Sequence, residues 1–121
     1  MDKGFDAEQV EVVLEHLAQQ KLQSDERFTE DFIHSRVLRG QGPIRIQLEL
    51  HERGASDELI EQYLDPSDPD WHSRVDEVRR KRFGTAMPED YQTRAKQARF
   101  LQYRGFTSEQ IRRALGQSDF D

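Results

Sequence analysis

The chain of 121 residues contains no cysteine, and this absence removes several kinds of chemistry at once. Without cysteine the protein can form no disulfide, no zinc–thiolate site and no thiol nucleophile. No apolar run approaches the length of a transmembrane helix, and no signal peptide is recognisable at the N-terminus. These absences are compatible with a protein of the reducing cytosol.

Catalytic motifs are missing as well. The four histidines occur singly, and no two have the spacing that places both imidazoles on one helical face. The chain has no Gly-x-Ser-x-Gly nucleophile elbow and no phosphate-binding Gly-Lys-Ser/Thr loop. Acidic pairs such as Asp25-Glu26 lie at expected helix starts, where the helix dipole explains them. We therefore expect no enzyme, no metal site and no cofactor.

Apolar residues are scarce and charge is abundant. Hydrophobic residues make up 34% of the chain and charged residues 35%, which suits a thin, elongated molecule better than a compact one. The net charge of −6 is unevenly distributed. Residues 1–70 contain 7 Lys and Arg against 17 Asp and Glu, a net charge of −10. Residues 71–121 contain 11 Lys and Arg against 7 Asp and Glu, a net charge of +4. Only this part of the chain therefore favours an anionic partner.

The stretch from Leu101 to Ile111 has the pattern of a tight joint between two helices. Gly105 can adopt the left-handed conformation that ends a helix. Thr107 is a good N-cap, and Gln110, three residues later, completes a capping box. Phe106 and Ile111 have the spacing of a hydrophobic staple around the cap.

The same joint occurs three times, with glycines at positions 4, 54 and 105. Each glycine follows a basic residue and precedes a polar cap and an apolar i, i+3, i+4 triplet. Nearly equal spacings of this size are typical of a repeat protein, and repeats build extended interaction surfaces. We expect Gly105 to have a positive φ, and Gly4 and Gly54 to have the same conformation.

The apolar periodicity and capping residues predict an all-helical fold with seven helices and no sheet. Ile44 to His51 alternates apolar and polar residues, as a strand does. However, Pro43 suits the first turn of a helix and Gly54 suits its end. If the segment is a helix, it is apolar on two sides, so we expect it to lie between two other helices. The predicted helices span residues 6–22, 24–39, 43–53, 56–64, 69–82, 88–103 and 107–115.

Two of these helices carry informative faces. In the helix 69–82, Trp71, Val75 and Val78 form the expected buried stripe, and the basic run 79–82 suits its C-terminal end. In the helix 88–103, the expected buried stripe is Tyr91, Ala95, Ala98 and Leu101. Its other face presents Lys96, Arg99 and Tyr103.

Three stretches together resemble the family of the bacterial regulatory protein RecX. These are Phe28 to Arg36, the segment Gly40-Gln41-Gly42-Pro43 running on to Leu50, and the C-terminal motifs at 81–84, 94–101 and 104–107. The resemblance implies tandem three-helix repeats in an elongated, curved arrangement. It assigns residues 1–22 to a partial first repeat, represented only by its third helix. Residues 23–66 would then form the second repeat and residues 67–121 the third.

The resemblance also implies a function. A member of this family would be a non-enzymatic inhibitor of the RecA recombinase that binds the RecA–single-stranded DNA filament. It would act in the cytoplasm as a monomer, in recombination, DNA repair and the SOS response, without a membrane partner. The alternative is a direct DNA-binding helical module that uses the basic C-terminal part.

We expect the third repeat to present a basic surface to an anionic region of the RecA filament. The candidate partner-binding residues are Arg94, Lys96, Arg99 and Arg104. The same side chains could instead form a solvated face that keeps a thin repeat protein soluble.

Overall fold

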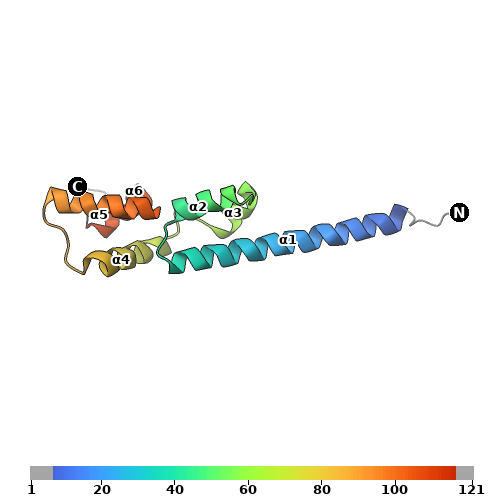
Figure 1. Cartoon of the computed structure of the whole chain (residues 1–121), viewed down its shortest axis with the longest axis horizontal. Coiled ribbons are helices and arrows are strands. Elements are labelled where there is room, and N and C mark those ends of the chain that lie inside the picture. The colour runs from blue at the N-terminus through green and yellow to red at the C-terminus, as the bar shows by residue number, and fades with distance from the viewer. Residues whose placement is uncertain (1–6, 117–121) are drawn as a thin grey trace.

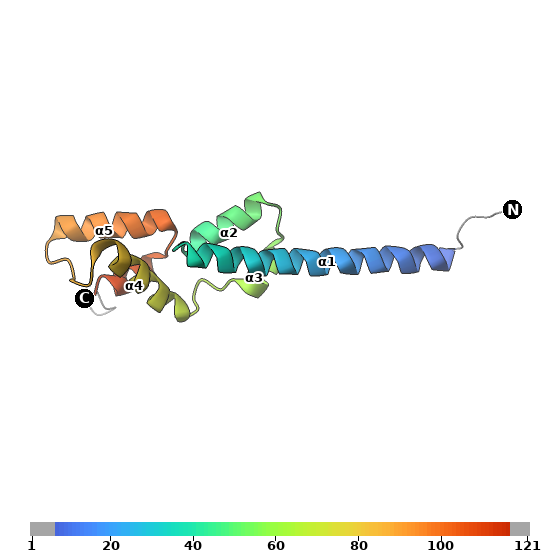
Figure 2. The ribbon, with the colours of Figure 1, turned by 60° about the horizontal axis from the view of Figure 1, so that its bottom comes forward.

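The computed structural model describes residues 7–116, with side chains described from Val10 onward. The regular secondary structure of this part of the chain is all α-helix, with no strand, as the sequence predicts. The molecule is elongated, and the N-terminal half of its first helix extends well beyond the other helices (Figures 1 and 2). The helices are α1 (Ala7–Leu38), α2 (Pro43–Glu52), α3 (Asp57–Tyr63), α4 (Asp70–Phe83), α5 (Tyr91–Arg104) and α6 (Ser108–Ala114).

The expected break between residues 22 and 24 does not exist. A single helix, α1, runs through it for 32 residues, so the described chain has six helices rather than the seven predicted. Ser24 has the side chain of an N-cap, but no glycine or proline lies between Leu22 and Ser24 to end a helix there. A serine without such a stop is tolerated inside a helix at a small cost. The expected start of the first helix at residue 6 and the first joint at Gly4 lie outside the described residues.

The segment that alternates like a strand is the helix α2, as Pro43 and Gly54 predict. Pro43 lies in its first turn, and Gly54 beyond its end has a φ of +90°. The expectation that both apolar sides are covered is wrong. Ile46 and Leu50 are fully buried, whereas Ile44 and Leu48 remain about half exposed. Within residues 7–116 α2 packs mainly against α1 and α3, and the side that carries Ile44 and Leu48 remains partly open.

Capping residues set most of the remaining boundaries. The Ser56 side chain accepts a hydrogen bond from the Leu59 N–H at 3.2 Å, and Thr107 and Gln110 form the predicted capping box. Gly105 has a φ of +99° and closes α5, which confirms the predicted left-handed stop. Gly84, with a φ of +88°, closes α4 after Phe83.

The helix α5 begins three residues later than expected. Asp90, not the turn at Pro88, caps it: its carboxylate accepts a hydrogen bond from the Thr93 N–H at 3.3 Å. Hydrogen bonding to the Thr93 side chain, and then to its backbone N–H, lowers the pKa of the Asp90 carboxyl below its ordinary value. Tyr91, predicted to be buried, is therefore the first residue of α5, at the end of the molecule away from α1, and is 83% exposed.

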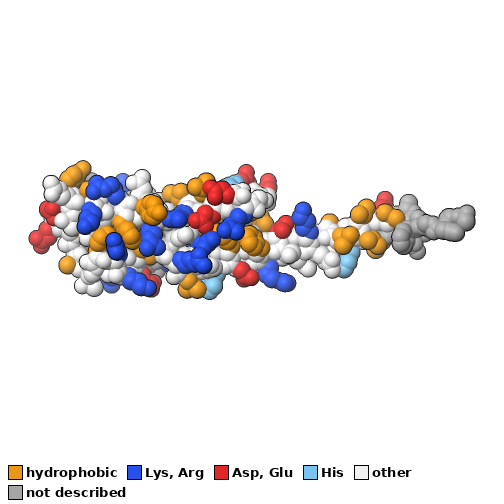
Figure 3. Space-filling view, in the orientation of Figure 1, with side chains coloured by type: hydrophobic (Ala, Val, Ile, Leu, Met, Phe, Trp, Pro, Cys, Tyr) orange, Lys and Arg blue, Asp and Glu red, His pale blue; other side chains and the backbone are white. Residues whose placement is uncertain are grey.

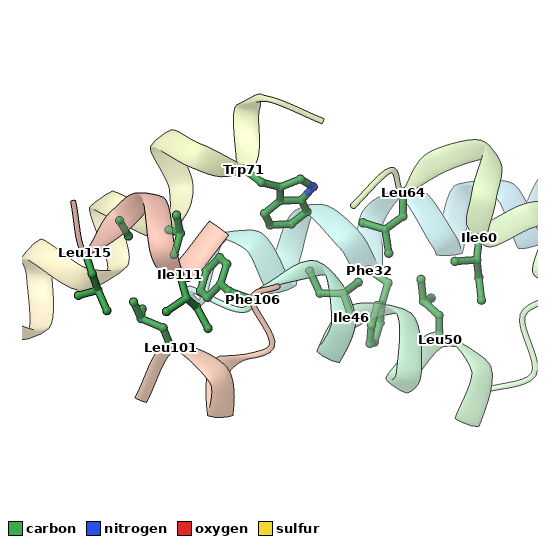
Figure 4. Close-up of a cluster of buried hydrophobic side chains, with 12 residues drawn as sticks. Phe32, Ile46, Leu50, Ile60, Leu64, Trp71, Leu101, Phe106, Ile111 and Leu115 are labelled. Atoms are coloured by element: carbon green, nitrogen blue, oxygen red, sulfur yellow. The ribbon is translucent and has the colours of Figure 1, made fainter. Parts of the chain in front are cut away.

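One apolar core connects all six helices. Phe32 from α1 and Ile46 from α2 belong to the same buried cluster as Trp71 from α4 and Leu101 from α5 (Figure 4). Trp71 meets Phe106 edge-on, with ring centroids 6.3 Å apart. The expected stripe on α4 is confirmed, with Trp71 and Val75 buried and Val78 packed against the cluster.

The end of α5 meets the start of α2 through backbone hydrogen bonds. The Gly42 N–H donates to the Arg104 carbonyl at 2.7 Å, and the Ile44 N–H donates to the Gly105 carbonyl at 2.9 Å. The C-terminal carbonyls of one helix thereby satisfy N–H groups at the N-terminus of another. The two helices follow one another along the long axis of the molecule (Figure 1). This contact fixes the two groups of helices relative to each other.

Candidate interaction surface

The structure separates the four basic residues that the sequence places on one surface. Lys96 and Arg99 are exposed on α5. Arg94 instead donates a hydrogen bond to the Leu115 carbonyl at 2.9 Å and so ties α5 to the end of α6. Arg104 donates to the Arg39 carbonyl at 3.0 Å, across the junction of α5 with α1. Arg94 and Arg104 are therefore partly engaged in holding the fold, whereas Lys96 and Arg99 are available to a partner.

A basic groove lies where the C-terminal end of α1 meets α4 and α5. Its volume is about 460 Å³. Lys and Arg side chains gather over α4, α5 and the C-terminal half of α1, and are sparse on the protruding half of α1 (Figure 3). The groove is lined by Val37, Leu38, Arg39, Gly40, Arg74, Glu77, Val78, Lys81, Arg82, Phe100 and Arg104. We call this set the junction groove.

The charges of the junction groove are almost all positive. Five cationic side chains and one carboxylate, that of Glu77, line it. Among the described residues, none of these five cations lies within ion-pairing distance of a carboxylate. The ion pairs of residues 10–116 lie elsewhere, on Glu49, Asp57 and Asp76. The groove therefore has positive charge that the described chain does not neutralise.

Aromatic rings position three of the groove arginines. The guanidinium groups of Arg82 and Arg104 lie 5.3 and 5.0 Å from the centroid of the Phe100 ring. The Arg74 guanidinium lies 4.7 Å from the Trp71 ring. Such cation–π contacts hold a guanidinium in place without using its N–H donors. In Arg104 one of these donors bonds the Arg39 carbonyl, and the others remain for a ligand. The cations of the groove are thus partly preorganised.

Sequence reasoning missed this groove, although part of its signal was present. Arg74, Lys81 and Arg82 occur at i, i+7 and i+8 on one helix, a spacing that places them on one face. Because the basic residues 79–82 are consecutive, the sequence does not distinguish Lys81 and Arg82 as members of this face. In the structure this run divides: Arg79 is fully buried, while its three neighbours are exposed. Arg39 and Arg104 come from distant segments, and only tertiary packing unites them with α4.

Arg79 serves the fold rather than a surface. Its Nη1 lies 3.3 Å from the Ala86 carbonyl and 3.5 Å from Gln97 Oε1, so it holds the α4–α5 connection over α5. Its Nε lies 3.9 Å from an Asp76 carboxylate oxygen. Gln97, rather than the expected Tyr91, is accordingly among the buried residues of α5.

No helix among residues 7–116 is long and apolar enough to cross a bilayer. The fold and the groove define a class: an elongated protein of packed three-helix units that offers an extended, locally basic surface. Comparison with known families identifies the units. The model of the second three-helix domain of RecX matches residues 24–64, and that of its third three-helix domain matches residues 72–115.

Individual relatives agree with the family models. The chain is 44% identical to a "Regulatory protein RecX" of Halorhodospira halophila, over 98% of this chain and 74% of the relative. It is 42% identical to the protein of the same name in Chromohalobacter salexigens, over 93% of this chain and 74% of the relative. It is also 42% identical to the protein of that name in Pseudomonas entomophila, over 97% of this chain and 76% of the relative. The chain belongs to the RecX family, which confirms the resemblance in its motifs.

Proposed function

We propose that this protein is a non-enzymatic modulator that inhibits the RecA recombinase by binding the RecA–single-stranded DNA filament. The observation that carries the proposal is the 44% identity over 98% of the chain to a protein named regulatory protein RecX. The absence of a catalytic motif from the sequence is in keeping with a regulatory role. We further propose that the protein acts in the cytoplasm as a monomer, without a membrane partner.

We also propose a division into repeats at residues 22/23 and 66/67. Residues 1–22 would belong to a first repeat, of which they supply the third helix, and residues 23–66 and 67–121 would form the second and third. The continuity of α1 across residue 22 means that the first two of these units would share one helix. Such a shared helix would lead directly from one repeat to the next and favour an elongated molecule.

The partner-binding surface that we propose lies on the basic third repeat. Lys96 and Arg99 are its most accessible members, and Arg104 contributes from the junction groove while Arg94 flanks them. Exposed cations of this kind mainly accelerate association with an anionic partner and make it dependent on salt.

A double charge reversal tests this surface. The Lys96→Glu, Arg99→Glu protein should inhibit RecA-driven ATP hydrolysis less than the parent at low salt, and the difference should narrow at moderate salt. Helicity and melting temperature should be unchanged, because both side chains are exposed. A matched reversal of Lys21 and Arg27, exposed on α1, controls for net charge. Equal inhibition by parent and variant at both salt concentrations would remove Lys96 and Arg99 from the interface.

A second candidate function is direct binding of DNA. It is favoured by the net charge of +4 over residues 71–121 and by the cations of the junction groove. Titration of labelled single-stranded DNA with and without RecA separates the two functions. Tight binding to bare DNA that weakens steeply with salt would favour this second function, whereas binding only in the presence of RecA would favour the first.

A further inference from the structure

We propose that the junction groove is a docking site for a short acidic protein segment that carries an apolar anchor residue. The inference rests on the geometry of the groove and does not require the partner to be RecA. Its volume of about 460 Å³ lies within the range of about 300–1,000 Å³ typical of ligand-binding clefts.

The charges of the groove favour an acidic partner. Four of the five cations of the groove are arginines, whose planar guanidinium groups bind carboxylates with two parallel hydrogen bonds. None of them has an ion pair within the described residues. An acidic partner would supply the missing counter-charges without displacing an existing contact.

The apolar residues of the groove favour an apolar anchor residue in that partner. Val37, Val78 and Phe100 line the groove and pack against the core, and Leu38, which also lines it, is 73% exposed. Covering an exposed leucine and the apolar residues beside it with an apolar side chain lowers the free energy of the complex. The mixture of charge and apolar surface thus fits a peptide with an aliphatic or aromatic residue among its acids.

The aromatic rings at the groove favour a protein segment over a nucleic acid. Proteins that hold single strands stack bases on aromatic side chains. The Phe100 ring already has the Arg82 and Arg104 guanidiniums within 5.3 Å of its centroid, and Phe83 lies edge-on to it at 5.3 Å. Trp71 is only 2% exposed. No aromatic ring that lines the groove is therefore open to a base.

The positive surface of the groove is limited in extent, which favours a short ligand. The groove is bounded by an acidic hollow that shares Val37 and Arg74 with it and contains Glu30, Asp65 and Asp68. A polynucleotide that continued past Arg74 would meet these carboxylates, and each phosphate there would be repelled. A short acidic segment can end within the groove and avoid them.

The affinity of a labelled peptide for the protein tests whether the junction groove docks an acidic segment. The probe is a fluorescein-labelled peptide of glutamates around a central Leu-Phe pair. A matched peptide has Ser-Ser at the centre, and an oligo-dT of the same charge tests nucleic acid. The groove variant is Arg39→Glu with Lys81→Glu, and its control is Lys21→Glu with Arg27→Glu, the same charge change on another part of the chain. All four side chains are exposed, so folding should survive and is checked by melting.

We expect the Leu-Phe peptide to bind the parent protein more tightly than either the Ser-Ser peptide or oligo-dT. The groove variant should weaken its binding about tenfold or more, because two attractive charges become repulsive, and the control should change it by less than about twofold. Leu38→Ser should abolish the preference for Leu-Phe over Ser-Ser.

Three results would overturn the inference: no binding of the Leu-Phe peptide to the parent, equal losses in the groove variant and its control, or oligo-dT binding tighter than the peptide. RecA is absent from this assay. Inhibition of RecA-driven ATP hydrolysis is measured separately, so a failure of the proposed function and a failure of this inference would be seen in different experiments.

Discussion

Gly42 and Gly105 face each other at the junction of α2 with α5, and a side chain on either would collide with the other segment. A Cβ on Gly42 would lie 2.4 Å from the Gly105 carbonyl carbon, and a Cβ on Gly105 would lie 2.4 Å from Arg45 Cβ. Gly42 has an extended backbone that any residue can adopt, whereas Gly105 has a φ of +99°. Gly54 provides the opposite case, with a φ of +90° and open space around it.

These three glycines allow backbone strain and steric collision to be measured separately. Gly54→Ala should lower the free energy of unfolding by about 1 kcal/mol, through left-handed strain alone. Gly42→Ala should lower it by about 1–3 kcal/mol through collision alone. Gly105→Ala, which combines both, should cost about 2–5 kcal/mol. Urea unfolding of the three variants checks the order, and equal costs for Gly54→Ala and Gly105→Ala would contradict the tight junction.

Single residues also show where sequence reasoning reached its limit. Lys96 and Arg99 are exposed, as their positions on the helix predict. Arg94 and Arg104 have the same side-chain chemistry, but they donate hydrogen bonds to the Leu115 and Arg39 carbonyls. These acceptors lie 21 and 65 residues away in the chain, so no local pattern could reveal them.

At the scale of elements, α1 has two halves with different surroundings. From about residue 26 onward it packs against α2 and α3 and contributes Phe32 to the core. Residues 10–25 are exposed throughout, including Val12 and Leu14. Leu22 and Asp25 line a hollow with residues of α3 but remain exposed. An isolated helical segment of this length is marginally stable in water, because few interactions offset the loss of chain entropy.

We therefore expect hydrogen exchange to divide α1. Amides of residues 12–22 should exchange much faster than those of residues 29–37, because only the second group needs the core to open. Mass spectrometry of peptides from the two halves measures this. Equal protection at high protein concentration that disappears on dilution would show that a second copy covers the first half. Equal protection at every concentration would contradict the marginal stability of that half.

At the scale of the whole molecule, the two matched RecX domains are not independent. Buried residues of both belong to one cluster, and Trp71 with Phe106 adjoins the residues contributed by α1 and α2. The backbone bonds between Gly42 and Arg104 and between Ile44 and Gly105 add a polar connection. Separation of the domains would expose apolar surface on each and leave these N–H groups without partners.

This shared core predicts a single cooperative unfolding transition for residues 24–115. Trp71 is the only tryptophan, and its indole N–H donates to the Asp65 carbonyl at 3.0 Å, close to the boundary between the domains. Its fluorescence and the far-UV circular dichroism should give the same midpoint in urea. A fluorescence midpoint clearly below the dichroism midpoint would show that the domains separate before they unfold.

The sequence by itself determined the helical class, the caps at Ser56 and Thr107 and the left-handed stops at Gly54 and Gly105. These features depend on residues within a few positions of each other, so the local chain encodes them. The family was also readable from motifs. Only the tertiary structure decided that α1 is continuous, that Ile44 and Leu48 stay exposed, and that Arg39 and Arg104 join α4 in one groove. These outcomes depend on which helices pack together, and contacts between distant segments follow from the shape of the whole core rather than from any single stretch.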